Sequence, residues 1–193
     1  MSAFNTANIL DLIDLVGEEE VEKILSDFSC EKNMEIEFFV KKSAIDFSKK
    51  KMSVTYLVFD EEMELAAMFA LTHKAIQIAN EGISKSAQKK IQRFSQLDES
   101  SNSYVVSAFL IAQFGKNSNY SGKPLSGNHL MRITEEILGQ IQRAIGGGIV
   151  YLECEEKDNL LNFYQNEENG YRIFDDRFSL IDNTKYIQLF KFI

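Results

Sequence analysis

The chain has 193 residues, with 29 acidic and 21 basic side chains and a formal net charge of −8. Its hydrophobic content of 45% is too high for a disordered protein, and its length suits one domain, 1–193, with a sizeable core. The acidic balance disfavours nucleic acid as a partner, because nucleic-acid binding needs a basic footprint. No apolar run approaches the ~20 residues of a membrane span, and no signal peptide is recognisable. We therefore expect a cytoplasmic protein that does not bind membranes.

The cysteines and histidines offer no metal site. Cys30 and Cys154 lie far apart, and neither His73 nor His129 has a partner at the spacing of zinc ligands. A disulfide framework would need more cysteines in a shorter, secreted chain. We interpret both thiols as reduced and structural, and we expect no metal.

The first half of the chain predicts helices, then a hairpin, then another helix. Apolar positions in residues 8–28 favour two short helices broken at Gly17, although a strand over 9–13 also fits. The remaining predicted elements of this half are a helix over 33–50, an antiparallel hairpin of strands 53–59 and 64–72, and a basic amphipathic helix over 84–94. The lysines of that last helix could form a solvated face, contact a phosphate or bind an acidic partner. The helix itself is also a candidate lid over a binding site.

The second half begins with a polar loop, 97–103, and an almost wholly apolar strand, 104–114, which should be buried on both faces. The later predicted elements, in chain order, are a loop over 115–127, a helix over 129–145, a strand over 149–154, a helix over 159–165 and strands over 171–174 and 186–192. Interleaved helices and strands predict a mixed α/β sheet in one domain.

The loop over 115–127 leads from a strand into a helix. A helix N-terminus gathers unpaired backbone N–H groups and a positive dipole end, which suits a phosphate or pyrophosphate. Gly127 would allow a close backbone approach, and Lys123 would add positive charge. The alternative is a connecting loop in which Ser126 caps the helix. The loop is neither a Walker motif nor a dinucleotide fingerprint.

Residues after the loop carry a family resemblance. Phe163 and Tyr164 lie on a predicted helix, and a turn at Gly170 and Tyr171 follows it. Together with the strand, loop, helix and strand before them, these residues resemble the GNAT superfamily of N-acetyltransferases. The resemblance covers about residues 28–193 and implies a GNAT-like sheet, mostly antiparallel with a splayed parallel pair and with helices on both faces.

The loop departs from the usual family pattern, Q/R-x-x-G-x-G/A. In the register that preserves the helix, Gly127 takes the sixth position, Leu125 replaces a glycine and Gly122 stands where Gln or Arg is usual. Pro124 supplies no N–H at all. In the other register, Pro124 and Ser126 fall on the glycine positions.

The resemblance implies that acetyl-CoA is a co-substrate and that the acetyl group passes directly to an amine. It implies that Tyr164 protonates the departing CoA thiolate. It also implies a set of CoA-binding residues: Ala112, Gln113, Phe114, Lys123, Leu125, Ser126, Gly127, Asn128, Asn159 and Asn162. Glu153 and Glu155 are candidates for the general base, and a solvated carboxylate is the plainer interpretation of each.

Several functions stay open at this point. The expected acceptor is an amine-bearing small molecule or protein, and a homodimer is compatible with this interpretation. One alternative is a catalytically degenerate GNAT-like module that acts by protein binding, which the missing loop glycines favour. Another is a toxin-like acetyltransferase acting on aminoacyl-tRNA, which the charge of −8 disfavours. A nucleotide-binding module is a weaker alternative, because the loop lacks the Walker Lys-Ser/Thr pair.

Overall fold

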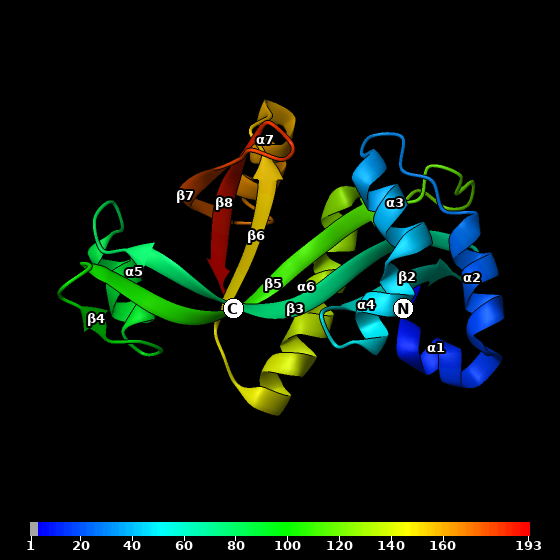
Figure 1. The fold of residues 1–193 in the computed structure, drawn as a ribbon, viewed down its shortest axis with the longest axis horizontal. Coiled ribbons are helices and arrows are strands. Elements are labelled where there is room, and N and C mark those ends of the chain that lie inside the picture. Colours follow the sequence, from blue (N-terminus) through cyan, green and yellow to red (C-terminus); the bar gives the residue numbers. More distant parts are fainter. Residues whose placement is uncertain (1–3) are drawn as a thin grey trace. The chain divides into compact units, whose positions relative to one another are not determined.

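The computed structural model describes residues 4–193, which form seven helices and eight strands (Figure 1). They pack into two compact units. The first unit contains the residues up to Thr72 together with Ile111–Thr134, and the second contains His73–Leu110 together with Glu135–Ile193. The expected single domain over 1–193 stays a prediction, and residues 1–3 of that range lie outside the described residues.

The first unit combines a sheet with four short helices. Its elements are β1 (Phe4–Asn8), α1 (Ile9–Val16), α2 (Glu18–Ser26), α3 (Met34–Lys42), α4 (Ala44–Lys49), β2 (Val54–Asp60) and the start of β3 (Leu65–Ala79). β2 pairs antiparallel with both β1 and β3, so the predicted hairpin is confirmed. The unit also holds the end of β5 (Ser103–Lys116) and the start of α6 (Gly127–Ile145).

The break between the first two helices is confirmed. Gly17 has a φ of +87°, a conformation that glycine adopts without steric cost, and its N–H donates to the Ile13 carbonyl at 2.9 Å. Residues 9–13 are helical, so the strand alternative is wrong. Asn8 accepts the N–H of Leu10 at 2.9 Å and caps α1, while β1, which precedes it, was not predicted.

The single helix predicted over 33–50 is wrong, because the chain turns at Ser43. This residue has φ −127° and ψ −25°, outside helical geometry, and it separates α3 from α4. The turn lets α4 bury one side of its own: Ala44 and Ser48 are both fully buried. The Ser48 hydroxyl also accepts the N–H of Thr55 on β2 at 3.1 Å, which ties α4 to the sheet.

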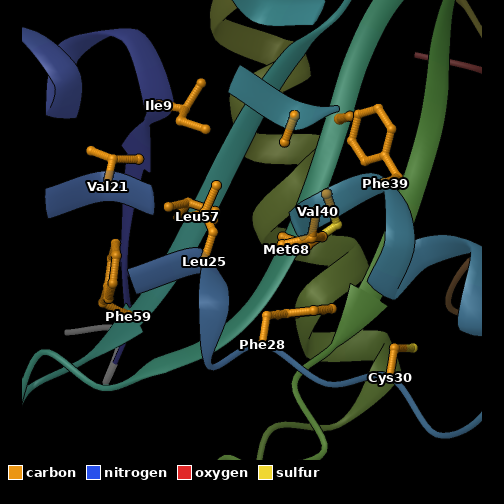
Figure 2. Close-up of a cluster of buried hydrophobic side chains, with 12 residues drawn as sticks. Ile9, Val21, Leu25, Phe28, Cys30, Phe39, Val40, Leu57, Phe59 and Met68 are labelled. Atoms are coloured by element: carbon orange, nitrogen blue, oxygen red, sulfur yellow. The ribbon is translucent and has the colours of Figure 1, made fainter. Parts of the chain in front are cut away.

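The core of the first unit lies between its helices and its strands (Figure 2). Its buried side chains come from all four helices, from the segment after α2 and from β2 and β3: Ile9, Val21, Leu25, Phe28, Cys30, Phe39, Val40, Ala44, Leu57, Phe59, Met68 and Ala70. Burial of each large apolar side chain contributes roughly 1.5–3 kcal/mol to stability.

Besides parts of β3, β5 and α6, the second unit contains α5 (Lys85–Ile91), β4 (Leu97–Asp98), β6 (Ile149–Glu155), α7 (Asp158–Gln165), β7 (Arg172–Ser179) and β8 (Thr184–Phe192). Its strands follow the order β3-β5-β6-β8-β7, with β4 also paired to β5. β5 and β6 are parallel, whereas β6 and β7 both pair antiparallel with β8. The predicted class, a mixed α/β sheet that is mostly antiparallel with one parallel pair, is confirmed.

Two element boundaries and one burial pattern in the second unit differ from expectation. The predicted polar loop over 97–103 contains the short strand β4. The start of β5 is buried on one face only, since Val105 is 58% exposed between two buried neighbours. β7 extends to Ser179 through polar residues, because main-chain pairing with β8 holds it in a strand without an apolar face.

Candidate functional site

The loop between β5 and α6 lies in the first unit and delivers the chain to a helix of 19 residues. Ser126 caps that helix: its hydroxyl accepts the N–H of His129 at 3.1 Å, and its carbonyl accepts the N–H of Leu130 at 3.0 Å. Leu125 is buried and its carbonyl accepts the Lys116 ammonium at 3.1 Å. The capping role of Ser126 is therefore observed, in a geometry that also presents the N-terminus of a long helix.

The same loop is tied to the turn between β2 and β3. The Tyr120 hydroxyl donates to Asp60 Oδ2 at 2.9 Å, while Asp60 Oδ1 accepts the N–H groups of Glu62 and Glu64 at 3.0 and 2.9 Å. Burial and the neighbouring Asp60 carboxylate together raise the pKa of Tyr120 to about 12. The loop is therefore anchored by a hydrogen bond from the neutral Tyr120 phenol to the ionised Asp60 carboxylate.

Gly122 is required by this anchor. A Cβ at position 122 would lie 2.6 Å from Asp60 Oδ2 and would also collide with the Tyr120 side chain. Nearby, Lys123 forms an exposed ion pair with Glu61, with 2.5 Å between its ammonium and the carboxylate. The positive charge predicted to face a phosphate is thus partnered by a carboxylate in this structure.

Eight of the predicted CoA-binding residues belong to the first unit. Ala112, Gln113 and Phe114 are consecutive, partly exposed residues at the end of β5. The other five lie in or next to the loop: Lys123, Leu125, Ser126, Gly127 and Asn128. The structure therefore joins the predicted strand and loop residues in one unit.

The remaining predicted site residues lie on α7 of the second unit. Asn159 and Asn162 are exposed and three positions apart, so they share one face of the helix. Tyr164 is buried near the end of α7, and its ring contacts the rings of Phe163 and Tyr171, with centroids 4.9 and 6.0 Å away. The Tyr164 carbonyl accepts the N–H of Tyr171 at 3.0 Å, which closes the predicted turn at Gly170.

The Tyr164 hydroxyl makes no hydrogen bond with residues 4–193. Burial, reinforced by the nearby Cys154 thiol, raises the pKa of this phenol above its usual range. The phenol is therefore protonated at neutral pH and keeps an uncommitted proton.

Cys154 lies on β6 and is also buried. Burial, with a smaller contribution from Glu155, raises the pKa of its thiol to about 11. A thiol with this pKa is a poor nucleophile at neutral pH, because the thiolate is the reactive form. The structure thus favours the prediction of a structural cysteine.

Comparison with known proteins shows what this fold resembles. No family model and no curated protein matches the sequence. The chain superposes on AtaT complexed with acetyl-methionyl-tRNAfMet with a TM-score of 0.62 and 13% identity, over 95% of this chain and 93% of that one. The superposition on a mutant of KacT has a TM-score of 0.64 and 14% identity, and it covers 96% of this chain and 94% of that one. These proteins belong to the GNAT superfamily. This chain has the GNAT fold.

The same fold is found in the NatC complex bound to Gag peptide and CoA, with a TM-score of 0.52, 14% identity and 98% coverage of both chains. The resemblance to the GNAT superfamily noted in the sequence is confirmed at the level of the fold. No helix in residues 4–193 of this GNAT-fold chain is long and apolar enough to cross a membrane.

A polar cluster on β6, β7 and β8 of the GNAT fold was not predicted. Glu153 accepts hydrogen bonds from the Tyr151 hydroxyl, from Gln188 Nε2 at 2.8 Å and from Arg177 Nε at 2.7 Å. Burial alone would raise the pKa of Glu153, but hydrogen bonds from Arg177, Tyr151 and Gln188 outweigh it and lower the pKa. The alternating pattern of β8 placed Gln188 on the Tyr186 face, but nothing in the sequence indicated Arg177.

This Glu153 cluster bears on the search for a general base. All the strong acceptor positions of the Glu153 carboxylate are engaged by donors, and its lowered pKa makes it a weak proton acceptor. Glu155, the other candidate, pairs with Lys157 at 2.5 Å. The structure therefore gives Glu153 a structural role.

Proposed function

We propose that this protein is an acetyl-CoA-dependent N-acetyltransferase that moves the acetyl group directly to an amine. The observation that carries the proposal is the hydroxyl of the buried Tyr164 at the end of α7, which makes no hydrogen bond in residues 4–193, in a chain with the GNAT fold. Because no protein group accepts its hydrogen bond, this hydroxyl is available to donate its proton to a ligand. The solved NatC complex holds CoA, which supports the choice of co-substrate.

In the first unit, the backbone N–H groups of Leu125, Ser126, Gly127 and Asn128 would receive the pyrophosphate. The Ser126-capped start of α6 fits this role, because N–H groups and the dipole of a long helix favour an anion. The Tyr120 anchor on Asp60 would hold the loop in place. Main-chain groups of Ala112, Gln113 and Phe114 would pair with the pantetheine arm as an added strand does.

In the second unit, Tyr164 would act as the general acid. The amine nitrogen attacks the acetyl carbonyl carbon and the carbon–sulfur bond breaks, so the electron pair leaves with sulfur. Tyr164 donates its phenolic proton to that sulfur, and a base removes the proton from the new ammonium. Asn159 and Asn162, exposed on the same helix, would bind CoA. The acceptor we propose is an amine-bearing small molecule or protein.

Aminoacyl-tRNA is a second candidate acceptor. The similarity to AtaT, which was solved with acetyl-methionyl-tRNAfMet, favours it. The net charge of −8 opposes it, because binding to a polyanion is driven by basic residues. A degenerate module that binds proteins without catalysis remains the alternative to both, on the strength of Pro124 and the replaced loop glycines.

The test has two stages. Thermal unfolding with millimolar CoA, acetyl-CoA and ATP comes first, and we expect stabilisation by CoA and acetyl-CoA only. An amine library, with charged tRNA as one member, is then assayed for released CoA thiol. Stabilisation without thiol release from any acceptor would support the degenerate module. No stabilisation by acetyl-CoA would overturn the proposed enzyme.

A further inference from the structure

A hollow of about 220 Å³ lies in the second unit, where α5 faces strands β7 and β8. From α5 it is lined by Ser86 and Lys90, and from the strands by Arg172, Phe190, Lys191 and Phe192. Arg172 and Phe190 are opposite each other in the β7–β8 register, so their side chains leave the sheet on the same face. We call this feature the α5 hollow.

Two cations at the α5 hollow have no acidic partner. Ion pairs among residues 4–193 engage lysines on α2, α3 and α4. Neither Lys90 nor Arg172 takes part in any of them. Lys191 differs, because it pairs with Glu135 at 2.7 Å. In a chain with eight more acidic than basic residues, this leaves a locally basic concavity with no carboxylate in its lining.

The apolar floor holds one of these charges at the rim. The rings of Phe190 and Phe192 meet edge to face with centroids 5.3 Å apart, and the Lys90 ammonium lies 5.2 Å from the centroid of Phe192. This cation–π contact positions the ammonium without neutralising it. Arg172 adds a planar fork of N–H donors from the β7 side.

We propose that the α5 hollow binds the phosphate group of a phosphorylated small molecule. A phosphate presents several strongly accepting oxygens around one centre, so it can meet a point charge from α5 and a guanidinium fork from β7 at the same time. The volume is below the roughly 300–1,000 Å³ of a complete small-molecule site, so the hollow holds one end of its ligand. The apolar floor suits the carbon skeleton that carries the phosphate.

This inference is independent of the proposed acetyl transfer, and its test needs no turnover. Calorimetric titration at low salt would compare 5′-AMP with adenosine and with citrate, using protein saturated with CoA so that a nucleotide site used by CoA is filled. Lys90→Gln and Arg172→Gln remove the two unpaired charges. Lys89→Gln is the matched control, because Lys89 is an exposed neighbour on α5 that does not line the hollow.

We expect 5′-AMP to bind the unmodified protein, and adenosine and citrate to bind at least about tenfold more weakly, since a charged hydrogen-bonded pair is worth about 1.5–3 kcal/mol. Lys90→Gln and Arg172→Gln should each weaken 5′-AMP binding about tenfold, and Lys89→Gln less than about twofold. Equal losses in all three variants would mean a diffuse charge effect and would overturn the site. Equal affinities for 5′-AMP and adenosine would overturn it as well, as would a failure of 5′-AMP to bind combined with an unchanged CoA affinity in Lys90→Gln.

The source of the phosphate needs one further comparison. CoA and 3′-dephospho-CoA would be titrated into the unmodified protein and into Lys90→Gln. If Lys90→Gln weakens only CoA, the hollow receives the phosphate of CoA itself; if it weakens 5′-AMP in the presence of CoA, the ligand is a separate molecule. Both results support a phosphate site, whereas no effect of Lys90→Gln on any of the three ligands would exclude it.

Discussion

The Tyr120 hydroxyl and the Asp60 carboxylate, 60 residues apart in sequence, form a hydrogen bond of 2.9 Å that fixes the loop before α6 to the turn between β2 and β3. The Asp60 carboxylate also accepts hydrogen bonds from the backbone N–H groups of Glu62 and Glu64, in the connection between β2 and β3. The loop proposed to bind pyrophosphate is thereby positioned by a side chain within it and not by its glycines alone.

Removing that hydrogen bond should loosen the loop. Tyr120→Phe is expected to weaken CoA binding several-fold, because the N–H groups at the start of α6 lose their pre-organised approach. Calorimetry with CoA measures the effect. Tyr56→Phe is the control, because its ring stacks on Phe69 in the same unit and its hydroxyl makes no hydrogen bond in residues 4–193. Equal affinities for the two variants would show that the anchor does not serve the loop.

Gly122→Ala should disturb the same anchor sterically. The added Cβ would lie 2.6 Å from Asp60 Oδ2, so Tyr120 or Asp60 must move. We expect a lower melting temperature and weaker CoA binding. Gly139→Ala is the matched control: it lies inside α6 with open space around a Cβ, and it should raise stability by about 0.5–1 kcal/mol. A destabilised Gly139→Ala, or an unaffected Gly122→Ala, would contradict this account.

Tyr164→Phe should separate catalysis from stability. Its hydroxyl makes no hydrogen bond in residues 4–193, so its removal should leave the melting temperature and CoA affinity nearly unchanged. Loss of a general acid should lower kcat about 100-fold. The crossed control is Tyr104→Phe, in which a buried tyrosine loses contacts with Gln92 and Asn80. That variant should lose about 1 kcal/mol of stability and keep its kcat. Similar kcat values for the two variants would remove Tyr164 from the mechanism.

The Glu153 cluster should make stability depend on pH. The pKa of Glu153 is lowered in the folded state, so its contribution is complete above the unfolded pKa near 4.5 and is lost as the pH falls through the folded value. Glu153→Gln should therefore cost about 1–3 kcal/mol at pH 7 and progressively less below about pH 4. Urea unfolding of Glu153→Gln and of the unmodified protein, at pH 7 and again below about pH 4, measures the loss of stability under each condition.

The control for that experiment is Glu155→Gln. Glu155 pairs with Lys157 in an ion pair whose side chains are 33% and 56% exposed, so solvent screens it. We expect a change below about 0.5 kcal/mol at either pH. A pH-independent cost for Glu153→Gln would indicate that packing, and not the carboxylate charge, holds the cluster together.

Local sequence patterns determined much of the fold. Spacing of apolar residues placed the helices on either side of Gly17 and the long helix α6, and β-branched runs placed the β2–β3 hairpin. The Phe163-Tyr164 and Gly170-Tyr171 pattern indicated the GNAT fold. These features depend on residues within a few positions of one another, so the chain encodes them locally.

Only the tertiary structure decided how the side chains are partnered. Lys123 pairs with Glu61, Glu153 pairs with Arg177, and Tyr120 bonds to Asp60, each across a long stretch of sequence. The bend at Ser43 likewise follows from burial of α4 against the sheet, and not from the sequence at the bend. The absence of acidic partners around Lys90 and Arg172 was equally hidden. An ion pair or a buried contact is made in space, and composition reports only how many charges there are.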